Sequence, residues 1–254
     1  MEYLSINAKV WDKNVAEGNQ WTLPVSSEQV AAARDGDWSV VLTPYRAVPR
    51  EWFGEVSGRR ILLIAGGGGQ QGPILAAAGA RVTVLDNSPA QLGQDEMVAR
   101  RDGLEIATVL GDMQDLSCFA DGSFDIALSL GGCFAQSVLP IWREAHRVLA
   151  PGGRLLAGHN NPVEFIFDMD DMLDGKLTVR HKIPYSDIRD LTPDEFDDIA
   201  RENGVCFGHT LEDLIAGQIA AGFTIHGFYE DKGVGYCLDN YISAFFATLA
   251  IKQI

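Results

Sequence analysis

The sequence predicts an α/β protein, a three-layer sandwich in which helices cover both faces of a mostly parallel sheet. From residue 61 onward, short runs of aliphatic and β-branched residues alternate with helical patterns, which is typical of successive βαβ units. A glycine-rich turn at 66–69 joins the first of these runs to a helix. The chain has 254 residues, of which 46% are hydrophobic and 22% charged. It is long enough for one large core with an added segment.

The order of elements follows from this alternation. Ser88 is expected to cap the second core helix, and Pro89 suits its first turn. The third helix is expected to end at 150–153, where proline and glycine turn the chain into the next strand. We expect core strands at 61–65, 81–86, 105–110, 124–130 and 153–158, with helices near 70–79, 88–102 and 137–149. A helix at 210–221 and strands at 222–230 and 242–251 complete the predicted core.

Two segments lie outside the alternation. Residues 1–57 have no βαβ rhythm, and their tryptophans and prolines predict a helical cap. Residues 161–208 are acidic and aromatic, with a helix expected at 193–203, and predict a lid-like insertion after the fifth strand. The chain is therefore expected to be a single catalytic domain, 1–254, whose core comprises 58–160 and 209–254.

Composition limits the possible partners. The net charge of −15 and the pI near 4.6 work against binding a nucleic-acid backbone, which needs Lys and Arg. The first residues do not resemble a signal peptide, and the apolar run at 244–251 is too short to span a bilayer. We therefore expect a cytoplasmic protein without membrane contact. No zinc-type spacing predicts a metal site, and reduced thiols are expected for the four cysteines, Cys118, Cys133, Cys206 and Cys237.

The glycine-rich turn is typical of a nucleotide-cofactor site. Gly67, Gly69 and Gly72 fit the G-x-G-x-x-G spacing, in which the backbone turns sharply and approaches a ligand at a helix N-terminus. Asp86 closes the next strand, where a carboxylate can accept hydrogen bonds from both ribose hydroxyls of a nucleoside. Two kinds of site fit this unit: one for a nicotinamide or flavin cofactor, and one for S-adenosylmethionine (SAM).

The residues that follow distinguish these two sites. Asp112 and Met113 come after the third strand, and they suit the exocyclic amine and the apolar faces of an adenine. The run 144–156 then contains Arg147-Val-Leu-Ala-Pro-Gly-Gly. With the glycine turn, Asp86-Asn87-Ser88 and Gly111-Asp112-Met113, these motifs occur in order and at the spacing of one family. The chain resembles the class I SAM-dependent methyltransferases over about 58–160 and 209–254.

The resemblance implies a Rossmann-like, seven-stranded sheet with an antiparallel last strand. It implies SAM as cofactor and S-adenosylhomocysteine (SAH) as product, lying across the carboxyl ends of the first four strands. One position departs from the family, which often has an acidic residue where Leu63 stands, near the methionine amino group. Carbonyls at Ala65 or Gly131, or the Tyr45 side chain, could replace it. The implied cofactor-binding residues are Ala65, Gly66, Gly67, Gly69, Asp86, Asn87, Ser88, Gly111, Asp112, Met113 and Leu130.

The methyl acceptor is expected at the ends of the fourth and fifth strands, where open α/β sheets bind ligands. His159 is the candidate catalytic base or orienting group, because a histidine titrates near neutral pH. A histidine hydrogen-bonded only to the local backbone is an equally consistent interpretation. A polar cluster in the insertion, which includes Asp187, could close over the substrate. The candidate pocket residues are Tyr45, Cys133, Phe134, Asn160, Asn161, His181 and Tyr185.

Other functions fit parts of the sequence. A nicotinamide-dependent oxidoreductase shares the glycine spacing, but no Tyr-x-x-x-Lys or comparable hydride-transfer motif is present. A catalytically silent SAM-binding protein is suggested by Leu63, and an RNA or protein acceptor stays open. A small-molecule acceptor fits the acidity and the predicted lid better. The sequence therefore predicts a SAM-dependent methyltransferase for a small molecule, and it does not determine the acceptor atom or the oligomeric state.

Overall fold

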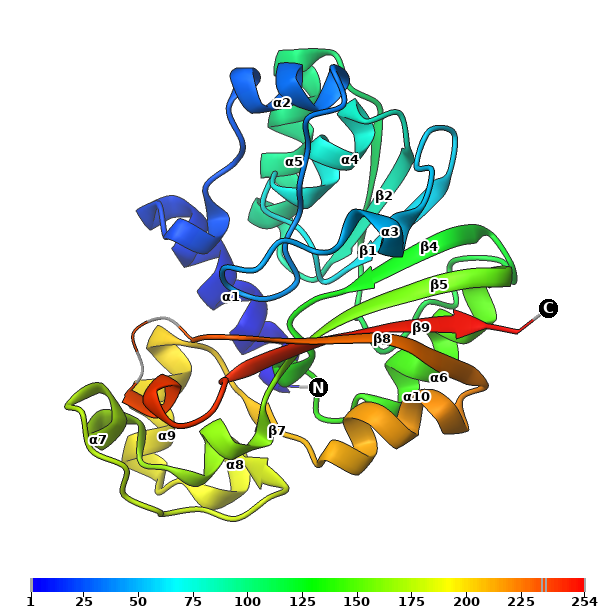
Figure 1. Ribbon diagram of the computed structural model, residues 1–254. Helices are drawn as coiled ribbons and strands as arrows, with labels where there is room; N and C mark the ends of the chain where they lie inside the picture. The colour runs from blue at the N-terminus through cyan, green and yellow to red at the C-terminus, as the bar shows by residue number, and fades with distance from the viewer. Residues whose placement is uncertain (1, 234, 236, 254) are drawn as a thin grey trace.

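A seven-stranded sheet forms the centre of the computed structural model, which describes residues 2–233, 235 and 237–253. The strand order is β3-β2-β1-β4-β5-β9-β8 (Figure 1). Strands β1 to β5 pair in parallel, whereas β9 runs antiparallel to both β5 and β8. The predicted sheet with an antiparallel last strand is therefore confirmed. The strands are β1 (Arg60–Ile64), β2 (Arg81–Asp86), β3 (Ile106–Leu110), β4 (Phe124–Ser129), β5 (Leu149–Asn160), β8 (Phe223–Asp231) and β9 (Phe245–Lys252).

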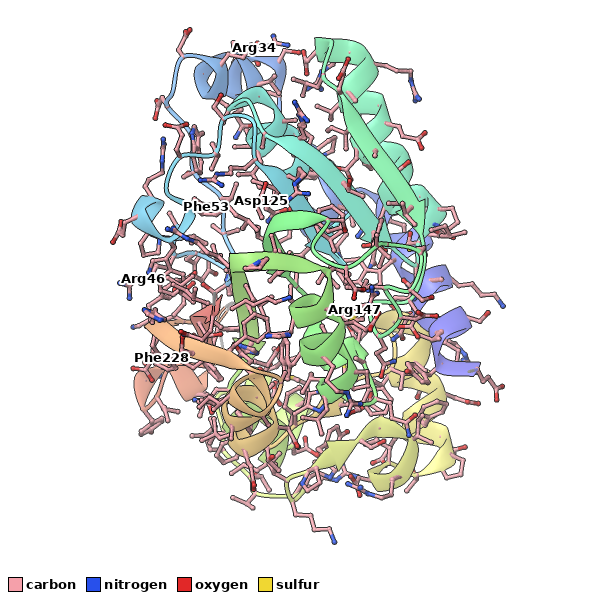
Figure 2. All side chains as sticks on the ribbon, turned by 90° about the vertical axis from the view of Figure 1, so that its right-hand side faces the viewer. Arg34, Arg46, Phe53, Asp125, Arg147 and Phe228 are labelled. Atoms are coloured by element: carbon pink, nitrogen blue, oxygen red, sulfur yellow. The ribbon has the colours of Figure 1, made fainter. Side chains whose placement is uncertain are left out.

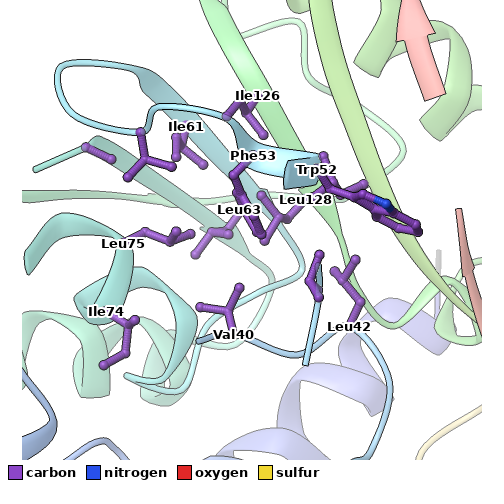
Figure 3. Packing of buried hydrophobic residues seen from close by; sticks show 14 of the residues in the cluster. Val40, Leu42, Trp52, Phe53, Ile61, Leu63, Ile74, Leu75, Ile126 and Leu128 are labelled. Atoms are coloured by element: carbon purple, nitrogen blue, oxygen red, sulfur yellow. The ribbon is translucent and has the colours of Figure 1, made fainter. Parts of the chain in front are cut away.

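The apolar run of β1 is continuous because both faces of the sheet are covered. Leu63 belongs to a cluster with Leu75 of α4, whereas Leu62 belongs to a second cluster with Trp142 of α6. All four residues are fully buried or nearly so. Figure 3 shows the first cluster around Leu63. A strand buried on both sides has no polar face, which explains the absence of alternation in β1. The helices concerned are α4 (Gln71–Ala77), α5 (Pro89–Asp102) and α6 (Leu139–Val148).

Local capping fixes where α5 begins and ends. The Ser88 side chain accepts a hydrogen bond from the Gln91 N–H, and Pro89 occupies the first turn, so both predictions are confirmed. Gly103 ends the helix in the left-handed conformation, with φ of 64°. These caps hold α5 directly behind the turn that follows β1.

Arg147 of α6 joins the helix to the loop before β4. Its guanidinium donates to the Glu144 and Asp121 carboxylates and to the carbonyls of Phe119 and Leu116. Figure 2 shows Arg147 at the surface of this helix. The arginine of the 147–153 motif therefore stabilises a loop of the core.

The N-terminal segment contributes both helices and core residues. It forms α1 (Glu2–Glu17), η1 (Gln20–Thr22), α2 (Ser27–Arg34) and α3 (Arg50–Phe53). Helix α1 lies against α5 and α9 (Pro193–Glu202), and α2 lies against α4. Val40, between α2 and α3, and Phe53 of α3 pack into the same cluster as Leu63 (Figure 3). The cap is thus part of the layer that covers one face of the sheet.

The insertion after β5 forms a separate group of short elements next to the sheet (Figure 1). Its two-stranded antiparallel ribbon pairs β6 with β7. The predicted helix at 210–221 lies in the expected place, but its first part has π-helical hydrogen bonding. No helix among the described residues is long and apolar enough to cross a membrane. The insertion contains η3 (Pro162–Ile166), α7 (Met169–Leu173), β6 (Tyr185–Ser186), α8 (Asp187–Asp190), α9 (Pro193–Glu202) and β7 (Phe207–Gly208). It is followed by η4 (Glu212–Ala216), which is the π-helical part, and α10 (Gly217–Ala220). Two further short helices are η2 (Gly132–Phe134), after β4, and η5 (Cys237–Asn240), between β8 and β9.

Gly158 of β5 is the point where the cap touches the sheet most closely. A Cβ at this position would lie 2.0 Å from the Leu42 carbonyl oxygen, so alanine forces the backbone of the cap away. Gly158→Ala should lower the free energy of unfolding by about 1–3 kcal/mol, as overpacking does. Gly93→Ala in α5 is the matched control, because nothing lies within 4 Å of its Cβ position. It should stabilise the protein by about 0.5–1 kcal/mol. Urea unfolding measures both variants, and equal midpoints would contradict the close contact.

Candidate functional site

A cavity of about 1310 Å³ lies where the core, the cap and the insertion meet. Its walls include the carboxyl ends of β1, β2, β4 and β5, which a parallel sheet brings to one edge. Sites for one small molecule are usually about 300–1,000 Å³. The cavity is therefore large enough for a cofactor and a second molecule together.

Most of the predicted cofactor-binding residues lie on the wall of this cavity at the sheet edge. Gly69 and Ser88 are the exceptions, because both turn into the protein. The Ser88 hydroxyl caps α5 and donates to the Asp12 carboxylate at 2.6 Å. The predicted residues that line the cavity are Ala65, Gly66, Gly67, Asp86, Asn87, Gly111, Asp112, Met113 and Leu130.

Asp86 places a carboxylate at the end of β2. Its Oδ2 accepts the Gly67 N–H at 3.0 Å, and its Oδ1 accepts the Ser88 N–H at 3.0 Å. These bonds fix the orientation of the carboxyl group, while burial raises its pKa. Each carboxylate oxygen can accept more than one hydrogen bond. The group is therefore suited to receiving two hydroxyl donors from the cavity side, as a ribose presents them.

The other N–H groups of the glycine turn point away from the cavity. Gly68 and Gly69 donate to Asp95 Oδ2 of α5, at 3.0 and 3.1 Å. In dinucleotide sites such N–H groups hold the pyrophosphate. Here they are bonded to the Asp95 carboxyl group and, for Gly68, also to the Gln91 carbonyl, so these donors are not available to a pyrophosphate. This arrangement argues against the nicotinamide alternative.

A second turn forms the part of the wall beside Asp86. Gly111 N–H donates to the Asp86 carbonyl at 2.9 Å, and Asp112 Oδ1 accepts the Gln114 N–H at 2.9 Å. Met113 and Leu130 add apolar surface. A carboxylate next to apolar side chains matches the amine and the faces of an adenine. The residues present at this end therefore fit SAM.

The opposite end of the cavity is lined by buried acidic and aromatic side chains. Tyr185 donates to Asp187, whose Oδ2 also accepts the Cys206 N–H at 2.5 Å. Burial raises the pKa of both the Asp187 carboxyl and the Tyr185 phenol. Glu164, 5% exposed, accepts a bond from Asn160 Nδ2 at 2.9 Å. Glu164 and Asp187 thus place buried carboxyl groups in this part of the wall.

Aromatic rings hold Tyr185 in place. The Phe165 ring is stacked on it at 5.7 Å between centroids, and the His181 ring lies at 4.8 Å. Elsewhere in the same cavity, Trp11 of the cap meets Phe134 edge to face at 5.5 Å. The tryptophan therefore both lines the cavity and packs the cap against the core.

Asn7 of α1 connects the cap, the core and the insertion. Its Oδ1 accepts the Val205 N–H at 2.6 Å, and its Nδ2 donates to the Val205 and Phe134 carbonyls at 3.2 and 3.4 Å. The adjacent residues Cys133 and Cys206 both line the cavity, and their thiols contact one another. Contact with Cys133, together with burial, raises the pKa of the Cys206 thiol, which is therefore uncharged at neutral pH.

His159 lies at the end of β5 and lines the cavity, but its ring is held by core residues. Its Nε2 is 3.2 Å from Thr248 Oγ1 and 3.4 Å from Gln218 Nε2, and the side chain is 5% exposed. Burial lowers its pKa to about 3. Such an imidazole is a weak base at neutral pH. The geometry favours a packed histidine over a base, but its partners are side chains distant in the sequence and not the local backbone.

The remaining predicted acceptor residues divide into two groups. Cys133, Phe134, Asn160, His181 and Tyr185 line the cavity. Tyr45 and Asn161 lie outside the lining: Tyr45 is 60% exposed, and Asn161 caps η3. Among the described residues, no group of three or more His, Cys, Asp or Glu side chains could hold a metal ion.

The buried polar residues that sequence reasoning missed at and behind the site include Asn7, Asp95 and Glu164. Asn7 is an isolated polar residue on the buried side of α1. Asp95 is an acidic residue on the buried side of α5, three residues after Leu92. Such buried polar positions within amphipathic helices are the available signal, but a sequence does not show which partner they meet.

The fold and the site together define a class I SAM-dependent methyltransferase. The family model described as "Methyltransferase domain" matches residues 62–157. Over 97% of both chains, the sequence is 50% identical to the "Uncharacterized methyltransferase YbaJ" of Bacillus subtilis (strain 168). The chain therefore belongs to this methyltransferase family, whose methyl donor is SAM.

More distant proteins share parts of the chain. The "Ubiquinone/menaquinone biosynthesis C-methyltransferase UbiE" of Paracoccus denitrificans (strain Pd 1222) is 35% identical over 117 residues, or 44% of this chain and 46% of that protein. A crystal structure of an S-adenosylmethionine dependent methyltransferase from Mesorhizobium loti has a TM-score of 0.61 at 21% identity. It covers 80% of this chain and 95% of that one, and it shows the same fold.

Asp95 makes the stability of the protein depend on pH. Burial raises its pKa to about 7, whereas an unfolded aspartate titrates near 3.9. Between these values the unfolded chain has released a proton that the native state keeps, so stability falls as pH rises. Asp95→Asn removes this titration. From pH 5 to pH 8, wild type should lose about 2–3 kcal/mol more than the variant.

Urea unfolding at the two pH values measures this difference. Glu96→Gln, an exposed neighbour on the same helix, should follow the wild type. Parallel curves for Asp95→Asn and wild type would contradict the buried, titrating carboxyl.

Proposed function

We propose that this SAM-dependent methyltransferase methylates a small protic molecule, an amine or a hydroxyl compound, held between the cofactor and the insertion. The observation that carries this proposal is the continuous cavity, which runs from Asp86 and Asp112 to Glu164 and Asp187. Its size leaves room for an acceptor beside SAM. The partial similarity to UbiE, whose name describes a quinone-pathway C-methyltransferase, also supports a small molecule.

At the cofactor end, three groups of residues hold SAM in this proposal. The backbone at 65–67 lies along the methionine moiety, Asp86 receives the ribose hydroxyls, and Asp112 with Met113 contacts the adenine. Leu63 is fully buried under the glycine turn, so the methionine amino group finds its acceptors among backbone carbonyls. The fixed orientation of Asp86 supports this assignment. The two N–H groups bonded to its carboxyl group leave further acceptor positions, on the cavity side, available to the ribose.

At the acceptor end, Glu164 and Asp187 are the proposed proton acceptors. Methyl transfer is an in-line displacement, and the protein's main task is to align acceptor, methyl and sulfur. An amine or hydroxyl acceptor must also lose a proton. That proton passes to the carboxylate while the heteroatom's electron pair bonds to the methyl carbon. The electron pair of the broken carbon–sulfur bond returns to sulfur. Tyr185 donates to Asp187 and orients it.

Charge favours a small acceptor over RNA. The cavity wall has several carboxylates, and Arg180 is the single Lys or Arg among its described residues. Arg180 is itself paired with Asp168 at 2.8 Å and with Glu195. A phosphate backbone gains affinity from unpaired basic groups, which this wall does not offer.

Isothermal titration with SAM, SAH and NADH tests the cofactor end. SAM and SAH should bind, whereas NADH should not. Asp86→Ala should weaken SAM binding at least 10-fold, because each lost hydrogen bond to a charged group costs about 1.5–3 kcal/mol. The exposed Asp121→Ala is the charge-matched control. Unchanged affinity in Asp86→Ala would overturn the ribose assignment, and NADH binding alone would redirect the search to redox chemistry.

Methyl transfer from labelled SAM to a fraction of cellular small molecules tests the acceptor end. Glu164→Gln and Asp187→Asn should keep the Kd for SAM, and at least one should lower the transfer rate about 10²- to 10⁴-fold, as loss of a general base does. Asp194→Asn, exposed on the same insertion, should not change the rate. Full activity in both lining variants would mean that neither carboxylate is the base.

A further inference from the structure

Asp95 stands out as a buried carboxylate outside the lining of the cavity. It is 0% exposed, and one of its oxygens, Oδ2, accepts both the Gly68 and the Gly69 N–H. The other oxygen, Oδ1, is buried and has no hydrogen-bond partner among the described residues. Burying a carboxylate with an unsatisfied oxygen is costly. Packing alone therefore does not explain why a carboxyl group occupies this position.

The surroundings of Asp95 show that the glycine turn is built around it. A Cβ on Gly72 would lie 2.7 Å from Asp95 Oδ1 and 3.4 Å from a Leu63 methyl group. A Cβ on Gly66 would lie 2.9 Å from Leu63 Cβ. Strand β1 thus places an apolar side chain beneath the turn, and α5 supplies the carboxylate. The absence of a side chain at Gly72 allows that carboxylate to reach the backbone.

The backbone of the turn requires an acceptor at this place. Gly68 and Gly69 have φ values of 118° and 71°, so two successive residues lie in the left-handed region. Successive N–H groups in such turns converge and form a concave site for an anion. No solvent reaches this side of the turn, and each unpaired N–H would cost about 1–3 kcal/mol. Asp95 accepts both N–H groups. The Gln91 carbonyl shares the Gly68 N–H at 3.1 Å, whereas the Gly69 N–H bonds to Asp95 at 3.1 Å.

The same turn continues directly into the proposed cofactor contacts. Gly67 N–H is the next donor along the chain, and it bonds to Asp86 at 3.0 Å. Three consecutive N–H groups therefore meet two carboxyl groups, Asp95 behind the turn and Asp86 at the cavity, and the Gln91 carbonyl shares the Gly68 N–H. A shift of the backbone at 68–69 would also move the Gly67 N–H and release one of the bonds that orient Asp86.

We propose that Asp95 is a positioning residue for SAM, a buried hydrogen-bond acceptor that fixes the glycine turn so that the 65–67 backbone and Asp86 face the cofactor. The proposal rests on the cofactor assignment made above. It also makes Asp95 a determinant of cofactor class, because the N–H groups that a pyrophosphate would need are already bonded within the protein. The carboxylate acts through the backbone and does not touch SAM.

Chemical rescue tests this role. Asp95→Ala should remain folded by circular dichroism at 25 °C and bind SAM at least 10-fold more weakly than wild type. Sodium formate should restore part of that affinity, because formate offers the missing oxygen to the two N–H groups. The same concentration of sodium chloride should not. Formate should also leave Asp86→Ala and the exposed control Glu96→Gln unchanged.

Asp95→Asn provides an independent readout if the alanine variant unfolds. Its amide oxygen can accept both N–H bonds, so most SAM affinity should return without formate. Gly72→Ala, which pushes a methyl group toward Asp95 Oδ1, should weaken SAM binding while Asp95 stays in place. A folded Asp95→Ala with a lower melting temperature but wild-type Kd for SAM would overturn the proposal.

A wild-type protein that does not bind SAM would instead contradict the cofactor assignment itself. If the wild-type protein binds SAM and only Asp86→Ala loses affinity, the cofactor assignment stands. Asp95 would then have no role in positioning SAM. The two failures are therefore distinguishable in one set of titrations.

Discussion

The hydrogen bonding of the glycine turn after β1 is the constraint on which the site depends. Three consecutive N–H groups, from Gly67 to Gly69, need acceptors, and two aspartates from the next βαβ unit provide them. Because Asp86 ends β2 and Asp95 lies on α5, the turn becomes tied to both elements that follow it. The shape of the cavity wall at this turn therefore depends on the packing of β1, β2 and α5.

The rest of the cavity is assembled from segments that are distant in the chain. Asn7 bonds to Val205 of the insertion and to the Phe134 carbonyl after β4, so one amide holds three segments together. A buried amide with all these bonds satisfied favours one arrangement of the segments, since breaking one leaves a costly unpaired group. This part of the cavity is therefore defined by polar contacts, whereas the sheet beneath it is defined by apolar packing.

Carboxyl groups line both ends of the cavity. SAM carries a sulfonium charge, and Asp86, Glu164 and Asp187 contribute carboxyl groups to the wall. Burial raises the pKa of Asp86 and Asp187, because removing a carboxylate from water costs free energy. Such groups reduce stability, and functional sites are where proteins retain them.

The sequence by itself determined the sheet, its helices and the cofactor class. Those depend on local signals: the apolar run 61–64, the cap at Ser88, and motifs in which neighbouring residues act together. Only the tertiary structure decided the partners of buried polar groups. It showed His159 among Thr248 and Gln218, left Tyr45 outside the cavity, and placed Asp95 beneath the turn. A hydrogen bond depends on a few ångströms between segments far apart in sequence, and local patterns contain no information about that distance.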